Sequence, residues 1–464
     1  MADVIASIVA LLLGVSFSVA ISQRVTPSER PSIYLGWAMH VMFGLLNVLL
    51  TYFYYGDGDM TSYVKHAQGA SAVIRQDPAA WVLPYLHHAL VPFSERLPFV
   101  PPGNHAPTQT VFMFVAFHQV AFGATIYGIN LFVGAFSFLS KGALYLVFRE
   151  VFPARYRQRI AIGLMAVPSV ALWSGCLTKE GVIWMTAGWV VWGYYQAFHK
   201  KKRGIGLTVM VFAAIPVALV KAYILFPMLV GFGVWSYWSS QSHERRANRV
   251  SGLGPIVLIL RTSIVFVVMV TGVLGLGRLF PRYALENFAG EAEHLQEIGS
   301  TAAGGSGYSL TVGSGIAGQV AAAPIAMFTA MFRPLLIEAR SPIAAANALE
   351  TTLLLFAVLF IVQRRRFRLV GLIRGSPPLM FCLVYVALFS VAVGLTTTNL
   401  GTLSRYRMPM VPYMGVMIAV LLPMKAKGGS PLRRRAAQKA QRQPEPQPSL
   451  QVVSLHEHRA KAGN

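Results

Sequence analysis

The stretch Tyr54-Tyr55-Gly56-Asp57-Gly58-Asp59-Met60-Thr61-Ser62-Tyr63 marks the point where a long apolar run ends and a large polar segment begins. The whole chain contains four aspartates, and two of them, Asp57 and Asp59, fall here one residue apart. Carboxylates at the end of a membrane span can hold a metal ion or accept a proton. A Gly-Asp-Gly-Asp turn that ends a helix and meets water explains the same residues equally well.

The composition around this stretch is that of a membrane protein. The 464 residues are 55% hydrophobic and 12% charged, and the mean hydropathy is +0.54. We therefore expect an all-α, polytopic membrane fold. The net charge of +23 is concentrated in basic runs that follow apolar runs, at 200–203, 364–366 and 433–435. This pattern is typical of cytoplasmic flanks and does not favour a nucleic-acid partner.

Apolar runs of sufficient length predict about eleven transmembrane helices. The Lys/Arg bias places the amino terminus outside and the tail inside, provided that 109–124 and 319–336 lie as helices on the outer face without crossing. The polytopic domain would cover 1–424, with outer loops 56–108 and 282–318, and residues 425–464 would form a disordered, basic, cytoplasmic tail. The predicted spans lie near 5–21, 33–55, 125–148, 159–176, 181–198, 205–220, 222–238, 255–278, 341–363, 376–395 and 408–424.

Several charged side chains gather on the predicted outer face. They come from three short elements: Lys179 and Glu180 in a turn, Arg333 in Phe-Arg-Pro, and Arg405-Tyr406-Arg407 before the last span. Arginine forks match phosphate oxygens, so this group predicts a site for phosphate or pyrophosphate. The alternative is that they anchor helices at the interface, or that Lys179 and Glu180 pair with each other.

Other polar residues are weaker candidates. Lys221 lies at the junction of a predicted hairpin, and Lys141 is expected to snorkel inward. The histidines show no metal-binding spacing, so His40 is expected to be structural. The motif at 313–318 has the spacing of a dinucleotide fingerprint, but no strand precedes it, and a flexible loop is the better interpretation.

The order of these motifs resembles that of the bacterial GT-C-type membrane glycosyltransferases found with exopolysaccharide genes. The motifs are Gly-Asp-Gly-Asp after an early span, Pro-Ser-x5-Gly-x3-Lys-Glu, Phe-Arg-Pro and Arg-Tyr-Arg-x-Pro-x2-Pro. The resemblance implies a GT-C-like fold in the bacterial inner membrane and a site that faces the periplasm. It also implies a polyprenyl-phosphate-linked sugar as donor, a glycan or lipid-linked acceptor, and membrane lipid as surroundings.

Carried onto this sequence, the resemblance implies that Asp57 or Asp59 is the catalytic base or a metal ligand. Lys179, Glu180, Arg333, Arg405, Tyr406 and Arg407 would then bind substrate, and a divalent metal is the one cofactor to consider. In that family the acidic motif usually follows the first span, whereas here it follows the second predicted span. Many members also have a large soluble carboxyl-terminal domain, whereas here only the tail at 425–464 is expected after the last span. Two other functions stay open: a polymerase of lipid-linked repeat units, and a lipid or glycan transporter, although no inverted repeat is evident.

Overall fold

The computed structural model describes residues 1–91, 97–99, 106–247, 290, 307–308 and 315–424. Within these ranges the regular elements are helices, and the only strand-like pairing is an isolated bridge between Gly307 and Asn399. Six helices are long and apolar enough to cross a membrane, which supports a multi-pass helical membrane protein. These candidate spans are Ala2–Ser22, Arg30–Tyr55, Tyr127–Val151, Arg203–Ser240, Pro342–Arg365 and Pro377–Thr396.

The predicted number of about eleven spans is thus not confirmed. The span predicted at 255–278, most of the loop predicted at 282–318 and the tail at 425–464 lie outside the described residues. So do Gly313 and Ser314 of the glycine motif, whose remaining residues begin helix α14 (Gly315–Phe332).

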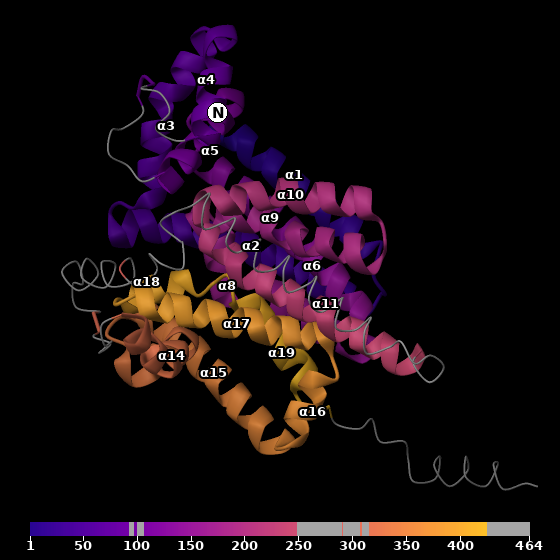
Figure 1. Ribbon diagram of the computed structural model, residues 1–464. Helices are drawn as coiled ribbons and strands as arrows, with labels where there is room; N and C mark the ends of the chain where they lie inside the picture. The colour runs from indigo at the N-terminus through magenta and orange to yellow at the C-terminus, as the bar shows by residue number, and fades with distance from the viewer. Residues whose placement is uncertain (92–96, 100–105, 248–289, 291–306, 309–314, 425–464) are drawn as a thin grey trace, which may run out of the picture. The chain divides into compact units, whose positions relative to one another are not determined.

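Helix α6 (Tyr127–Val151) is the centre of the amino-terminal bundle and the most buried of the candidate spans. It packs against α1 (Ala2–Ser22), α2 (Arg30–Leu50) and α9 (Lys179–Tyr194) (Figure 1). Small residues allow these close approaches: a Cβ on Gly128 would collide with Ala6, and one on Gly188 with the Ser140 carbonyl.

The chain reverses direction at Lys221, as the sequence predicted, so the range Arg203–Ser240 holds two helices rather than one straight span. Helix α10 (Arg203–Lys221) packs along α9, and a 3₁₀ turn at Ala222–Ile224 leads into α11 (Leu225–Ala247). Lys221 reaches Glu180 at the start of α9, whereas the Tyr194 hydroxyl at the end of α9 donates to the Phe232 carbonyl at 3.0 Å. Helix α11 therefore runs antiparallel to α10.

The span predicted at 159–176 is instead two short helices, α7 (Arg157–Met165) and α8 (Pro168–Ser174). The break precedes Pro168, because the residue before a proline avoids the helical region. Glu350 of α15 (Pro342–Arg365) accepts a hydrogen bond from the Ser169 backbone N–H at 2.8 Å and thereby caps α8. This internal role explains a carboxylate within an apolar helix.

The segment predicted as the outer loop 56–108 is largely helical. Helices α3 (Asp59–Gln76) and α4 (Pro78–Leu90) pack against α5 (Ala106–Phe122). The Gln119 amide donates to the Val64 carbonyl at 2.9 Å, and Arg75 Nε donates to the Val120 carbonyl at 3.1 Å. A five-residue π-helical turn, Thr51–Tyr55, joins α2 to this unit.

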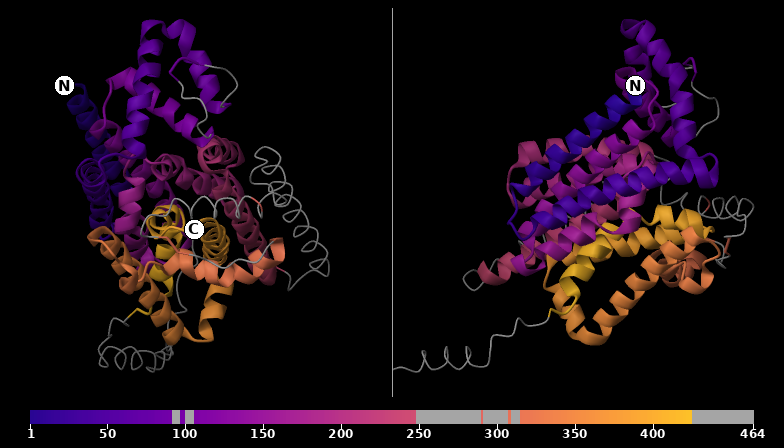
Figure 2. Two further views of the ribbon diagram at one scale, coloured as in Figure 1. Left: turned by 90° about the vertical axis from the view of Figure 1, so that its left-hand side faces the viewer. Right: turned by 180° about the vertical axis from the view of Figure 1, so that it is seen from behind.

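The remaining helices belong to the carboxyl-terminal part of the described chain (Figure 2). Helix α17 (Pro377–Thr396) packs against α11, α14 and α19 (Val411–Leu421), and α16 (Arg368–Arg374) precedes it. Helix α18 (Leu400–Tyr406) follows it. The shorter turns are Ala154–Tyr156, Tyr195–His199 and Leu336–Glu338.

The basic segments lie together at one end of the helices. Arg149 near the end of α6 pairs with Glu29 at 2.7 Å, and Lys200 after α9 pairs with Glu150. The opposite ends of α6 and α9 meet where the Leu177 N–H donates to Asn130 at 2.7 Å. We call the end that carries Arg149 and Lys200 the basic end. The described helices thus separate basic segments from the elements that carry Asp59 and Glu180.

Candidate functional site

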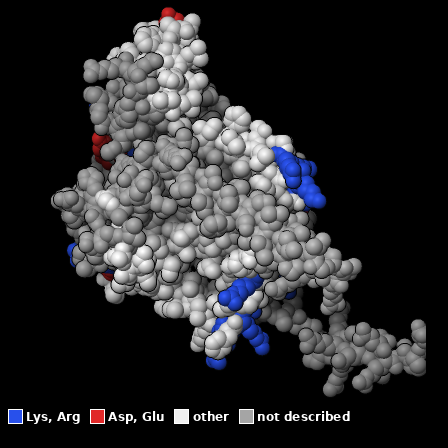
Figure 3. All heavy atoms as spheres, viewed as in Figure 1, with Lys and Arg blue, Asp and Glu red and all other residues white. Residues whose placement is uncertain are grey.

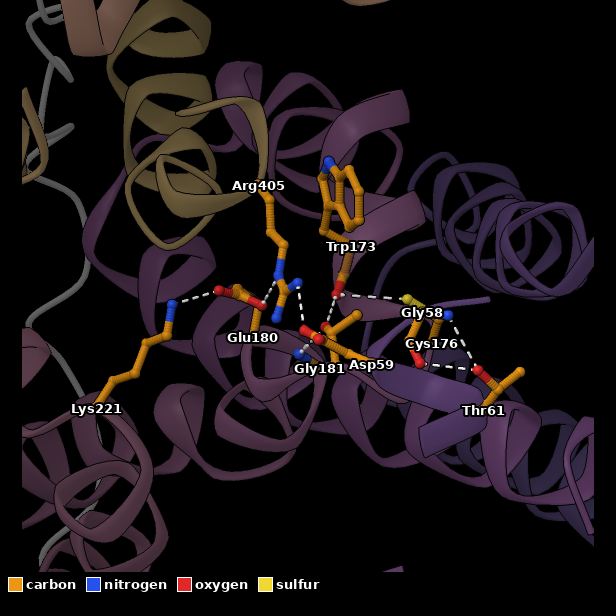
Figure 4. Close-up of polar contacts among 10 residues, drawn as sticks. Gly58, Asp59, Thr61, Trp173, Cys176, Glu180, Gly181, Lys221 and Arg405 are labelled. Atoms are coloured by element: carbon orange, nitrogen blue, oxygen red, sulfur yellow. Dashed lines mark hydrogen bonds and ion pairs between the residues drawn. The ribbon is translucent and has the colours of Figure 1, made fainter. Parts of the chain in front are cut away.

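Four charged side chains from distant parts of the sequence form one continuous network (Figure 4). Arg405 Nη1 lies 2.7 Å from Asp59 Oδ2, and Arg405 Nε lies 2.6 Å from Glu180 Oε2. Lys221 Nζ donates to the other oxygen of Glu180. The sequence predicted that Asp59, Glu180 and Arg405 share a site, and the structure brings these three together.

Each member of the network sits at a helix terminus that suits its charge. Asp59 and Glu180 are in the first turns of α3 and α9, and Lys221 and Arg405 are in the last turns of α10 and α18. Negative side chains are favoured at helix amino termini and positive ones at carboxyl termini. Local sequence therefore favours each charge where it stands, before any ion pair forms.

Two polar caps fix the backbone beneath the network. The Thr178 hydroxyl accepts from the Gly181 N–H at 3.0 Å and begins α9. The Asn399 side chain accepts from Gly401 and Thr402 N–H groups and begins α18. Such caps satisfy amide groups that have no partner within the helix. They hold Glu180 and Arg405 in register with each other.

The network is graded from water to the protein interior. The side chain of Asp59 is 51% exposed, that of Arg405 19%, and that of Glu180 is fully buried. Lys221 is also buried and lies 4.1 Å from the centre of the Tyr406 ring, within range of a cation–π contact. From the solvent side Asp59 therefore comes first and Arg405 second, with Glu180 and Lys221 behind them.

Electrostatics keep Glu180 ionised despite its burial. Burial alone would raise the pKa of Glu180, but the nearby Arg405 and Lys221 cations outweigh burial and lower it to about 2. The pKa of Arg405 rises well above its ordinary value, because the attraction of Glu180 and Asp59 exceeds the cost of burial. Glu180 is therefore ionised and Arg405 is positively charged at physiological pH.

Lys179 adds a cation beside the network. Burial, and then repulsion from Lys221, lowers the pKa of Lys179 to about 8. Within the described chain its ammonium makes no hydrogen bond, and Glu180 pairs with Arg405 and Lys221 rather than with Lys179. The pairing considered as an alternative is thus absent, and Lys179 is the cation with donors to spare.

Asp57 lies next to the network but does not join it. Its carboxylate accepts from the Gly58 N–H at 2.7 Å and from the Thr61 hydroxyl. The Thr61 hydrogen bond, and then the Gly58 hydrogen bond, lower the pKa of Asp57. Asp57 is exposed to water, so it is available to a ligand but less basic than an ordinary carboxylate.

Arg333 is held at a separate place. Its Nε donates to Glu338 Oε1 at 2.8 Å, and its guanidinium lies 4.8 Å from the centre of the Tyr308 ring. The Tyr308 N–H in turn donates to the Thr398 carbonyl at 2.8 Å, just before α18. The structure thus connects Arg333 to the α17–α18 turn without direct contact between Arg333 and Asp59 or Arg405.

Arg407 is buried and acts within the fold. Its Nη1 donates to the Arg333 carbonyl at 2.6 Å and its Nη2 to the Asn347 side chain. Thr351 completes the contact by donating to the Pro334 carbonyl at 2.6 Å. The prediction that Arg407 binds substrate therefore has a competing explanation: Arg407 fixes the turn that carries Arg333.

A second buried polar cluster surrounds Lys141. Contrary to the expectation that Lys141 snorkels, its side chain is fully buried and lies 2.7 Å from His40 Nε2 and 3.0 Å from the Ser137 hydroxyl. Ser174 at the end of α8 accepts a third hydrogen bond. The short side chains of Ser137 and Ser174 give the ammonium polar partners at depth, so it has no need to reach the interface.

The part of the chain that the structure describes holds no group of three or more His, Cys, Asp or Glu side chains that could bind a metal ion. Asp57 and Asp59 remain the predicted ligands, and water or substrate would have to supply the others. No family model, curated protein or solved structure matches this sequence.

The sequence made Lys221 only a weak candidate, whereas in the structure it pairs with Glu180 and belongs to the network. The available signal was its position: a lysine at the reversal between two apolar runs, one helical hairpin away from Glu180. Intramembrane charges of this kind usually have a partner.

Proposed function

We propose that the chain is a membrane glycosyltransferase of GT-C type that moves a sugar from a polyprenyl-phosphate donor to an acceptor on the outer side of a bacterial inner membrane. The observation that carries this proposal is the contact between Asp59 and Arg405, which are 346 positions apart. It supports the pairing of an acid with a phosphate-binding cation that the motif resemblance implies.

The chemistry requires two charges in one place. The acceptor hydroxyl loses a proton as it attacks the anomeric carbon, and the bond from that carbon to the phosphate oxygen breaks. Negative charge develops on the leaving phosphate, where fixed cations stabilise it. In this protein Arg405 and Lys179 would receive the phosphate, and Asp59 or Asp57 would receive the proton.

The graded burial of the network supports a way to couple these two roles. Asp59 is half exposed and can leave Arg405, whereas Glu180 is buried and paired with two cations. A phosphate that takes the place of Asp59 on Arg405 would free the Asp59 carboxylate for the acceptor. Donor binding would thus prepare the base.

A complementation experiment tests the proposal. Cells that lack the chain would receive Asp59→Asn, Asp57→Asn or the wild type at equal expression, and their extracellular polysaccharide would be measured. We expect Asp59→Asn to reduce output strongly, because an amide does not accept the proton. Asp77→Asn is the matched control, since Asp77 is an exposed helix cap at the other end of α3. Full output from both site variants would remove the catalytic assignment.

A further inference from the structure

A cavity of about 220 Å³ beside α17 is lined only by apolar side chains. The lining comes from five helices, α14, α15, α16, α17 and α19. Met327, Met331, Met414 and Met417 contribute four flexible side chains, which adapt to ligands of irregular shape. A cavity without polar atoms in its lining does not hold water stably and suits a hydrocarbon.

The cavity is bordered by arginines at one end. Leu369 and Ile373 of α16 line it, and Arg368 and Arg374 are their immediate neighbours on the same helix. Leu421 also lines it, and the Leu421 carbonyl accepts from Arg365 Nε at 3.0 Å. Figure 3 shows blue side chains gathered on this part of the surface.

Within the residues that the structure describes, these arginines have no acidic counterpart. The sequence contains no Asp or Glu between Glu350 and Glu445, a stretch that holds the arginines at 364, 365, 366, 368 and 374. Arg366, Arg368 and Arg374 are exposed and, within the described chain, make no side-chain hydrogen bond or ion pair. Their guanidinium groups can therefore receive an anion from outside the protein.

The surroundings of α16 indicate that this anion is in a lipid layer. Phe367 is 96% exposed, and Val370 and Leu372 are also exposed, beside the arginines. A short helix with apolar and basic side chains both uncovered is typical of the membrane interface, where the apolar groups enter the acyl region and the arginines meet the headgroups.

We infer that the cavity and Arg366, Arg368 and Arg374 form a discrete site for one anionic phospholipid, with an acyl chain among the methionines and the phosphate on the arginines. The site is distinct from the proposed catalytic network. Helix α17 has 20 residues and separates α16 from α18, so the two places are about 30 Å apart along that helix.

The charge arm of the test uses the full-length protein purified in detergent and returned to phosphatidylcholine nanodiscs with increasing phosphatidylglycerol. Native mass spectrometry counts the lipids that stay bound after the protein is released from the nanodiscs. We expect one phosphatidylglycerol on the wild type and at least about tenfold weaker retention in R366Q/R368Q/R374Q. The matched control K201Q/K202Q/R203Q removes three exposed charges next to Lys200, at the basic end and outside the cavity lining, and should retain the lipid.

The cavity arm uses Ala387→Phe, which fills the space from a partly exposed lining position without removing a charge. It should lower retention to a similar degree, and it decides the matter if the triple variant fails to fold. Equal retention of phosphatidylcholine and phosphatidylglycerol by the wild type would overturn the inference. So would an equal loss in the K201Q/K202Q/R203Q control, which would show general attraction to a charged surface.

Discussion

Arg405 bridges Asp59 and Glu180 with two different nitrogens, 2.7 Å from the first carboxylate and 2.6 Å from the second. The bridge joins the exposed start of α3 to the buried start of α9. A guanidinium can do this because its donors point in fixed, divergent directions in one plane. Lysine has no such fork, so Arg405→Lys should keep at most one of the two contacts.

The first prediction concerns the buried half of the network. Glu180→Gln should lower the free energy of unfolding by about 3–5 kcal/mol, because it leaves the buried Lys221 without its carboxylate and leaves Arg405 with Asp59 alone. Thermal unfolding in detergent measures the loss. Glu150→Gln is the control, because the Lys200–Glu150 pair is exposed and should be worth about 1 kcal/mol or less. Equal effects of the two substitutions would contradict the structural importance of Glu180.

The second prediction concerns pH. The pKa of Lys179 is lowered to about 8, so the ammonium is mostly protonated at pH 7 and loses its charge as the pH rises past 8. Binding of a phosphate-bearing ligand should therefore weaken above pH 8, by up to about tenfold per pH unit. Lys179→Arg should move this decline to much higher pH, because arginine stays charged. A decline at the same pH in both proteins would exclude Lys179 as its source.

The third prediction concerns helix packing. A Cβ on Gly163 would lie 2.8 Å from the Gly415 backbone, where α7 crosses α19. Backbone has no room to give way, so Gly163→Ala should destabilise the protein by about 1–3 kcal/mol. Gly204 is also helical but has open space around its Cβ position, so Gly204→Ala should be neutral or slightly stabilising. Measured side by side, the unfolding temperature of Gly163→Ala should lie below that of Gly204→Ala.

Local sequence predicted much of the fold. Apolar runs predicted α1, α6, α15 and α17 closely, because a span needs a continuous apolar stretch and little else. The apolar run at 159–176 was wrongly predicted as one span, because hydropathy carries no information about the backbone restriction before Pro168. The helices within 56–108 were missed because their apolar faces are intermittent and covered by α5.

The candidate site was only partly predictable. Charges at helix ends are visible in a sequence, and they predicted Asp59, Glu180 and Arg405. Which cation meets which carboxylate depends on tertiary packing, so the sequence suggested a Lys179–Glu180 pairing and did not predict the Lys221–Glu180 pair that forms. Arg333 and Arg407 are similar in sequence context to Arg405. Only the structure shows that Arg333 already pairs with Glu338 and that Arg407 already donates to Asn347.

The most direct test of the proposed function is whether farnesyl phosphate, a soluble short-chain polyprenyl phosphate, binds the purified protein at pH 7. The shift in unfolding temperature measures this binding. The wild type should be stabilised, and Lys179→Gln and Arg405→Gln should each weaken binding at least about tenfold, whereas Lys201→Gln should bind as the wild type does. Farnesyl phosphate that binds all four proteins equally, or none of them, would contradict a phosphate site at the Asp59–Arg405 network.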